Sequence, residues 1–257
     1  MRYIDKFSTS GDVQTAINNG TLLKPYVAYV EASESLDWNT KEPPHDYSKD
    51  YLTFEILSAG TISILNNDGI YYSLNEGAWT KQRGDINVNA GDTVRLYSTT
   101  TNKTPQFRTS TAVYNVCGNI MSLGYGQDFV DKTTLAVGYS QMFKYCTGII
   151  SAENLVLPAT TLTVECYKDM FQNATNLISG PTLPAQTLVQ SAYEGMFIGC
   201  SNLQYIKCLA ESGIDSNKST YYWLGSVASS GTFVKKAGVT WPSGASGIPN
   251  NWTVVEV

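Results

Sequence analysis

The 257-residue sequence predicts a mostly β protein with short helices. Three observations favour this class: short runs of β-branched and aromatic residues between Gly, Asn and Asp turns, a hydrophobic content of 42% with only 15% charged residues, and an internal repeat in the second half. We expect four parts: a small N-terminal α+β unit with its linker at residues 1–49, an antiparallel β-sandwich at 50–117, a short leucine-rich-repeat solenoid at 118–210 and a C-terminal β cap at 211–257.

The N-terminal unit is expected to combine one helix and one strand. Ser10 is a suitable N-cap for a helix over residues 11–18, and residues 25–30 are rich in β-branched and aromatic residues, as a strand requires. Residues 39–49 contain two consecutive prolines and several charges, which is typical of a linker. A unit this small and apolar buries too little surface by itself. We therefore expect it to pack on sister chains or on a host particle.

Short strands follow one another through the second part. Their expected ranges are 51–57, 61–65, 70–74, 86–88 and 93–97. The turn residues Asn66, Asn67, Asp68 and Gly69 predict a hairpin between the second and third of these strands. Strands separated by Gly, Asn and Asp turns at this spacing predict a small sandwich.

Three copies of one pattern define the third part. Each copy has Tyr, then Met-Phe, then a small residue four positions after the Met and an aliphatic residue seven positions after it. The copies are Tyr139, Met142, Phe143, Cys146 and Ile149; Tyr167, Met170, Phe171, Ala174 and Leu177; and Tyr193, Met196, Phe197, Cys200 and Leu203. The spacings between the Met residues, 28 and 26, lie within the range of leucine-rich repeats.

A repeat of this kind predicts a stack in which equivalent residues form columns, because one copy cannot bury its apolar face alone. We expect the three Met-Phe pairs to be buried in equivalent places, and the Tyr-x-x-Met-Phe segment to form a short helix. A solenoid end has to cover its apolar face. Residues 221–224, 231–234 and 252–255 offer strands for such a cap.

The sequence offers little for catalysis or metal binding. Its one histidine, His45, lies in the linker, where no packing holds it for a Ser-His or Cys-His mechanism. Its five cysteines include no C-x-x-C pair, and their odd number argues against a complete disulfide framework. Glu165 and Asp169 leave glycoside hydrolysis as an alternative. We predict no enzyme activity, no catalytic residue, no metal and no cofactor.

Charge and hydropathy limit the partners. The formal net charge is −5 and the basic residues are scattered, so we expect no nucleic-acid binding. No stretch of 18 apolar residues occurs and the start lacks an apolar core, so a complete chain is expected to have neither a secretory signal nor a membrane insertion. Tyr221, Tyr222 and Trp223 form the densest aromatic cluster and are a candidate binding surface. The alternative for each of these three residues is a place in the capping core.

The repeat pattern, with Leu-Pro-Ala between copies at residues 157–159 and 183–185, resembles the BspA-like leucine-rich-repeat surface proteins of gut Bacteroides-type bacteria and of their phages. The lead-in at residues 116–123 and the tail at residues 227–254 are similar to the corresponding parts of such proteins. A shorter similarity, at residues 3–7 and 23–29, is to N-terminal segments of phage structural proteins from the same community.

The resemblance implies an adhesive or structural role. The expected function is that of a virion-exposed structural or fibre-type protein of a gut phage, located at the virion surface and used for attachment or host binding. Residues 1–40 would contact other virion proteins, and the remainder a host surface protein or glycan. A homo-oligomer is expected, with a trimer favoured by analogy with phage fibres. The alternative is an adhesin at the bacterial cell surface.

Overall fold

The computed structural model describes residues 5–7, 28–30, 45–65, 68–100, 105–108 and 110–257. The chain divides into two compact units, Met1–His45 and Asp46–Val257. In the first unit, strands β1 (Asp5–Phe7) and β2 (Ala28–Val30) pair in parallel. The helix expected over 11–18 and most of the expected linker lie outside the described residues, whereas the expected strand at 25–30 overlaps β2.

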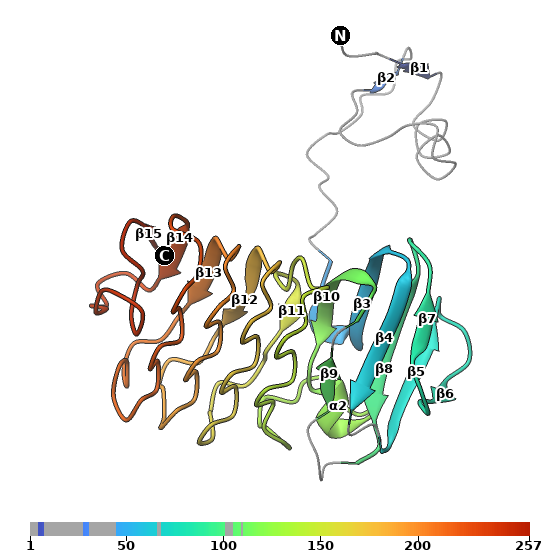
Figure 1. Ribbon diagram of the computed structural model, residues 1–257, viewed down its shortest axis with the longest axis horizontal. Coiled ribbons are helices and arrows are strands. Elements are labelled where there is room, and N and C mark those ends of the chain that lie inside the picture. The colour runs from blue at the N-terminus through green and yellow to red at the C-terminus, as the bar shows by residue number, and fades with distance from the viewer. Residues whose placement is uncertain (1–4, 8–27, 31–44, 66–67, 101–104, 109) are drawn as a thin grey trace. The chain divides into compact units, whose positions relative to one another are not determined.

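The second unit begins with two β-sheets, which Figure 1 shows beside the stacked repeats. The larger sheet has the order β11-β10-β3-β8-β5-β6, and the smaller one has the order β7-β4-β9. All pairs are antiparallel except the parallel pair β10–β11. The bounds are Leu52–Ser58 for β3, Gly60–Leu65 for β4, Ile70–Leu74 for β5, Thr80–Lys81 for β6, Ile86–Val88 for β7, Thr93–Ser98 for β8, Gln106–Arg108 for β9, Val113–Asn119 for β10 and Leu155–Val156 for β11.

Alternating apolar side chains join the two sheets. Along β3, Leu52, Phe54 and Ile56 are buried, as is Phe107 of β9. The rings of Phe54 and Phe107 meet edge to face with centroids 4.9 Å apart, so the sheets share one apolar interior. The short 3-10 helix η1 (Tyr47–Lys49) precedes β3.

The predicted hairpin at residues 66–69 is wrong. Strands β4 and β5, which flank it, belong to different sheets, so the connection crosses between sheets. Strand β5 pairs instead with β8, where Tyr71 lies opposite Tyr97 and their rings stack with centroids 5.2 Å apart. A turn motif specifies a local reversal, whereas the choice of the neighbouring strand depends on these cross-strand contacts.

The repeats stack in parallel beyond β11. Strands β12 (Ser179–Leu183), β13 (Tyr205–Cys208), β14 (Thr232–Lys235) and β15 (Thr253–Glu256) form a four-stranded parallel sheet (Figure 1). Between β10 and the first repeat lies the single-turn helix α2 (Ser122–Tyr125). In the part of the chain that the structure describes, no helix is both long and apolar enough to cross a membrane.

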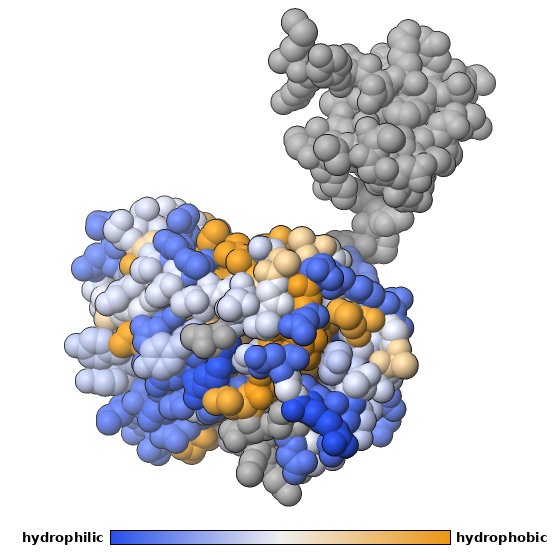
Figure 2. Space-filling view, turned by 45° about the vertical axis from the view of Figure 1, so that its right-hand side comes forward, coloured by the Kyte–Doolittle hydropathy of each residue, from blue (hydrophilic) through white to orange (hydrophobic). Residues whose placement is uncertain are grey.

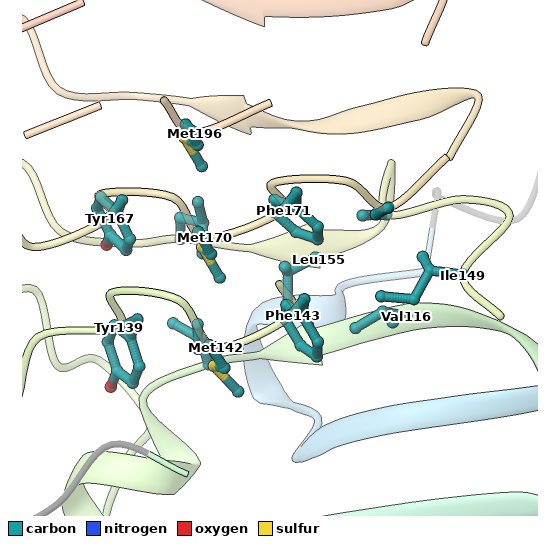
Figure 3. Close-up of a cluster of buried hydrophobic side chains, with 14 of the residues drawn as sticks. Val116, Tyr139, Met142, Phe143, Ile149, Leu155, Tyr167, Met170, Phe171 and Met196 are labelled. Atoms are coloured by element: carbon teal, nitrogen blue, oxygen red, sulfur yellow. The ribbon is translucent and has the colours of Figure 1, made fainter. Parts of the chain in front are cut away.

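Equivalent side chains of successive repeats form columns, as predicted (Figure 3). Phe143 stacks on Phe171 at a centroid distance of 5.2 Å, and Phe171 on Phe197 at 5.4 Å. A second column joins the repeat tyrosines at 6.1 and 6.0 Å. All three Met-Phe pairs have no exposed surface, which confirms the prediction for Met142, Phe143, Met170, Phe171, Met196 and Phe197.

The short helix predicted for the Tyr-x-x-Met-Phe segment is wrong, because the segment consists of turns. In each copy, the residue before the Met has a positive φ: 58° at Gln141, 55° at Asp169 and 60° at Gly195. A left-handed residue interrupts a right-handed helix, so its N–H group is free to bond elsewhere. The N–H of Gln141 donates to Lys168 O in the next repeat at 2.9 Å, and that of Asp169 to Glu194 O at 2.8 Å. Hydrogen bonds between repeats thus replace those of a helix.

Aromatic residues cover both ends of the stack. At the start, Phe107 of β9 stacks on Phe143 at 5.2 Å, and its N–H donates to Met142 O at 2.8 Å. At the other end, Trp223 stacks on Tyr193 at 6.1 Å and Trp241 on Trp223 at 5.4 Å. The stack is therefore bordered by the sheets on one side and by indole rings on the other.

A fourth set of turns continues the stack where a strand was expected at residues 221–224. Gly195 and Gly199 donate their N–H groups to Tyr221 O and Gly225 O, as Asp169 and Asn173 do to the third repeat. The pattern is hidden in the sequence because Thr, Trp and Leu replace Tyr, Met and Phe. The other two expected strands overlap β14 and β15.

All five cysteines are free and buried. Two of them bond to the preceding layer of the stack: Cys146 Sγ donates to Phe107 O of β9 at 3.1 Å, and Cys200 Sγ donates to Phe171 O of the second repeat at 3.0 Å. Ala174 holds the equivalent place in the second repeat. Burial raises the pKa of the Cys146, Cys166, Cys200 and Cys208 thiols to about 12.

Replacing Phe171 by alanine is expected to lower the free energy of unfolding by about 3–5 kcal/mol, because the cavity would interrupt the phenylalanine column. Urea denaturation measures this change. The control is Val164→Ala, whose side chain is 58% exposed, and for which a change below about 0.5 kcal/mol is expected. Equal effects of the two substitutions would contradict a continuous column.

Stability is expected to fall as the pH rises from 9 towards 12. A buried thiol with a raised pKa favours the folded state fully below the pKa of 9.0 of a free thiol, and this contribution disappears as the pH approaches about 12. Each such thiol would increase the loss of unfolding free energy by at most about 1.4 kcal/mol per pH unit. Urea midpoints measured from pH 8 to 11 test this, and the Cys200→Ala variant should show a shallower decline. A midpoint independent of pH in this range would contradict thiol burial.

Candidate functional site

The turns of the four repeats form a continuous polar surface, called the turn face below. Of the side chains that form it, all but Ser191 are at least partly exposed, and each turn is held by backbone hydrogen bonds to the next repeat. The residues of the turn face are Ser140, Gln141, Lys144, Tyr145, Glu165, Lys168, Asp169, Gln172, Asn173, Gln190, Ser191, Glu194, Ile198, Asn217, Lys218, Tyr221 and Tyr222. The hydrogen bonds from turn to turn between successive repeats hold the backbone beneath this surface.

Ion pairs connect successive repeats across the turn face. Lys168 Nζ lies 3.1 Å from Glu165 Oε1 and 3.4 Å from Glu194 Oε1. Burial disfavours the charged form of Lys168, but the hydrogen bond to Glu165 and the charge of Glu194 outweigh it and raise the pKa of the lysine. Lys144 Nζ lies 3.4 Å from Asp169 Oδ2. The lysines and carboxylates thus neutralise one another along the stack.

A glycine allows one of these carboxylates to lie against the next repeat. Gly195 has a φ of 60°, and a Cβ at this position would overlap Asp169 Oδ1. A side chain there would be unfavourable both for the backbone and for the space that Asp169 occupies. The carboxylate therefore remains close to the backbone and in reach of Lys144.

A hollow of about 360 Å³ opens on the turn face. Three successive repeats line it, with Glu165 and Lys168 from the second, Gln190, Ser191 and Glu194 from the third, and Asn217 and Lys218 from the fourth. Two lysines and two glutamates balance in charge, and amide and hydroxyl groups complete the lining. The hollow therefore suits a polar ligand held by hydrogen bonds better than a strongly charged one.

One of the three predicted surface residues, Tyr221, lies beside Lys218 of the lining of this hollow, and Tyr222 contacts Tyr221. Tyr221 and Tyr222 are 45% and 49% exposed, and their rings meet edge to face with centroids 4.8 Å apart. Lys218 Nζ lies 5.8 Å from the centre of the Tyr221 ring. The hydrogen bond from Gly195 N to Tyr221 O holds Tyr221 beside the third repeat, next to Glu194. The exposed rings and the polar hollow are thus adjacent.

Trp223 does not belong to this surface. It has no exposed area, its ring lies between Tyr193 and Trp241, and its Nε1 donates to Gly247 O at 2.9 Å. Tyr222 has a φ of 49° and lies within the turn. Along this turn the side chains of Tyr221 and Tyr222 are exposed, whereas that of the next residue, Trp223, lies in the core. The prediction that all three aromatic residues form one surface is therefore corrected to the tyrosine pair.

The hollow itself was not predicted from the sequence. A detectable pattern existed, because Glu165 and Ser191 each stand two positions before a repeat tyrosine, and Lys218 stands two before the equivalent Thr220. All three have positive φ. Equivalent positions of stacked repeats lie side by side, so polar residues there were bound to meet.

The arrangement offers hydrogen bonding and ring contacts. Glu165 and Asp169, the carboxylates considered for hydrolysis, each pair with a lysine. His45 is exposed at the end of the first unit. Within the described ranges, no group of three or more His, Cys, Asp or Glu residues is placed to hold a metal ion.

Replacing Lys168 by alanine is expected to change the free energy of unfolding by less than about 1 kcal/mol, because its ion pairs are partly exposed to solvent. Urea denaturation in low and in high salt measures the change in the free energy of unfolding, and high salt should reduce this change further. Glu153→Ala, an exposed carboxylate on another part of the repeats, is the control. A loss above 3 kcal/mol would show that the ion pairs stabilise the fold rather than shape the surface.

Comparison of the chain with protein-family models, with curated proteins and with solved structures found no match. The chemistry of the turn face, with two exposed tyrosines beside a polar hollow on a rigid stack, is therefore the basis for inferring what the protein does.

Proposed function

We propose that this chain is a non-enzymatic attachment protein of a gut phage virion, and that its turn face binds a protein or glycan on the host surface. The observation that carries the proposal is the pair of half-exposed tyrosines, of which Tyr221 contacts Lys218 in the lining of the polar hollow. Tyrosine supplies a large contact area with little loss of side-chain entropy, which makes it a frequent anchor of binding surfaces.

We further propose that the stack of repeats is a short leucine-rich-repeat solenoid, an architecture that would suit this role. The columns of Phe and Tyr rings, the parallel strands and the hydrogen bonds from turn to turn are what such a repeat would produce. A solenoid presents equivalent positions of each repeat on one face, so several repeats contribute to one binding surface. Binding residues on a rigid scaffold are ordered before the partner arrives, which reduces the entropy cost of association.

The attachment end is proposed to be residues 1–40, which would contact other virion proteins. Its support is the apolar composition of the sequence in this segment. Closed symmetry is the usual arrangement of soluble assemblies, and a trimer is proposed by analogy with phage fibres. The turn face would then be present in several copies, and weak single contacts would add up to stronger attachment.

The second candidate is an adhesin at the bacterial cell surface. The same tyrosine pair and hollow would serve it, so the surface does not distinguish the two proposals. Antibodies against the purified protein do: gold label on virions supports the phage protein, and label on intact bacterial cells supports the adhesin.

Replacing both Tyr221 and Tyr222 by alanine is expected to weaken binding of the labelled protein to gut Bacteroides-type cells at least tenfold, because the anchoring rings are lost. The matched control is Tyr145→Ala. Tyr145 is 47% exposed at the far end of the turn face and has Lys144 Nζ 5.6 Å from its ring, as Tyr221 has Lys218 at 5.8 Å. Unchanged binding by the double variant would contradict the assigned surface, and an equal loss in the control would contradict the assignment of the anchor to Tyr221 and Tyr222.

A further inference from the structure

A second aromatic group lies on the outer face of the larger sheet, away from the sandwich interior. It consists of Tyr51, Tyr71, Trp79 and Tyr97, all partly exposed. Trp79 meets Tyr51 at a centroid distance of 4.9 Å and Tyr97 at 4.7 Å, both edge to face. Tyr71 stacks on Tyr97 at 5.2 Å with an angle of 6° between the rings. These contacts hold the rings in fixed orientations.

The strand pattern explains why these rings face outward. On β8, Val94, Leu96 and Ser98 are buried between the sheets, so Arg95 and Tyr97 project from the opposite face. Figure 2 shows hydrophobic residues in scattered patches among hydrophilic ones on the face that it presents. Rings that remain partly exposed on a polar surface are available for contact with a ligand.

A hollow of about 480 Å³ adjoins this group at the end of β8. Its walls come from residues 97–99 and from residues 124–128, which include the end of α2, so Tyr97 belongs to both the aromatic group and the hollow. Gly126, with a φ of 63°, brings the second wall close to β8, because a Cβ there would lie 3.1 Å from Ser98 O. The volume is within the range of about 300–1,000 Å³ that is usual for small-molecule sites.

The polar lining of this hollow favours a ligand with many hydroxyl groups. Gln127 and Asp128 are exposed at its rim, and their planar amide and carboxylate groups can each hydrogen-bond to two neighbouring hydroxyls. Of the residues described around the hollow, Asp128 alone is charged. Nearby cations are engaged: Arg95 lies 5.6 Å from the Trp79 ring and 3.7 Å from Glu76, and Lys132 lies 5.5 Å from the Tyr125 ring. An anionic ligand would thus meet a carboxylate and no free lysine or arginine among these residues.

We propose that this hollow binds a neutral saccharide, with a sugar ring against the Tyr97–Trp79 group and its hydroxyls on Gln127 and Asp128. The apolar face of a sugar ring packs on an aromatic ring, and its edge hydroxyls need donors and acceptors at the side. An apolar peptide side chain would instead bury the polar rim without partners, which is unfavourable. The site shares no residue with the turn face and does not depend on the function proposed for it.

The test uses the full-length protein on an array of immobilised oligosaccharides: neutral ones built from glucose, galactose, mannose and N-acetylhexosamines, and sialylated and sulfated ones. The expected result is binding to neutral oligosaccharides, followed by measurement of Kd for the best of them by calorimetry. Failure to bind any neutral oligosaccharide, or a preference for the acidic ones, would overturn the proposal.

Three variants assign the site. Trp79→Ala and Gln127→Ala are each expected to raise Kd at least tenfold, whereas Glu153→Ala, an exposed residue outside both hollows and the turn face, should leave it unchanged. Gln127 is exposed, so its variant remains informative if Trp79→Ala does not fold. Neutral oligosaccharide binding that survives Gln127→Ala, or that is lost in Glu153→Ala, would place the saccharide elsewhere and overturn the proposal.

Discussion

Each repeat of this protein can bury its apolar face only against a neighbour, and the contact between Phe107 and Phe143 provides the first neighbour. Phe107 belongs to the smaller sheet and is held there by its pairing with β4 and by its contact with Phe54. Every later phenylalanine stacks on the one before it. The sheets therefore serve as the base of the stack, and Trp223 and Trp241 close its other end with larger rings.

The same constraint produces the turn face, on which we propose that a partner binds. Because hydrogen bonds run from each turn to the next repeat, the turn residues adopt positive φ, and their side chains separate into a buried and an exposed set. The buried set forms the ring columns, whereas the exposed set forms the ion pairs and the hollow. Stability and binding thus depend on one backbone arrangement but on different side chains, so surface variants can test function without loss of the fold.

The two hollows differ in chemistry and position on the fold. The turn-face hollow is lined by paired charges, with Lys168 between two glutamates, and Tyr221 lies beside Lys218 of its lining. The hollow at the end of β8 is lined by tyrosine, hydroxyl and amide side chains with one carboxylate, and Tyr97 of this lining stacks on Tyr71 of the sheet. The first suits an extended protein or glycan surface that crosses several repeats, and the second suits a single small ring.

The sequence by itself determined the mostly β class, the three-copy repeat and the burial of its Met-Phe pairs, because periodic apolar positions must meet when copies stack. It could not reveal that residues 215–227 form a fourth set of turns, since Trp223 and Leu224 fill the same space with different side chains. It also predicted a helix at the repeat turns and a hairpin at residues 66–69. Only the tertiary structure decided these points, because turn-to-turn hydrogen bonds outweigh local helix preference, and strand partners are chosen by contacts such as that of Tyr71 with Tyr97, which are distant in the sequence.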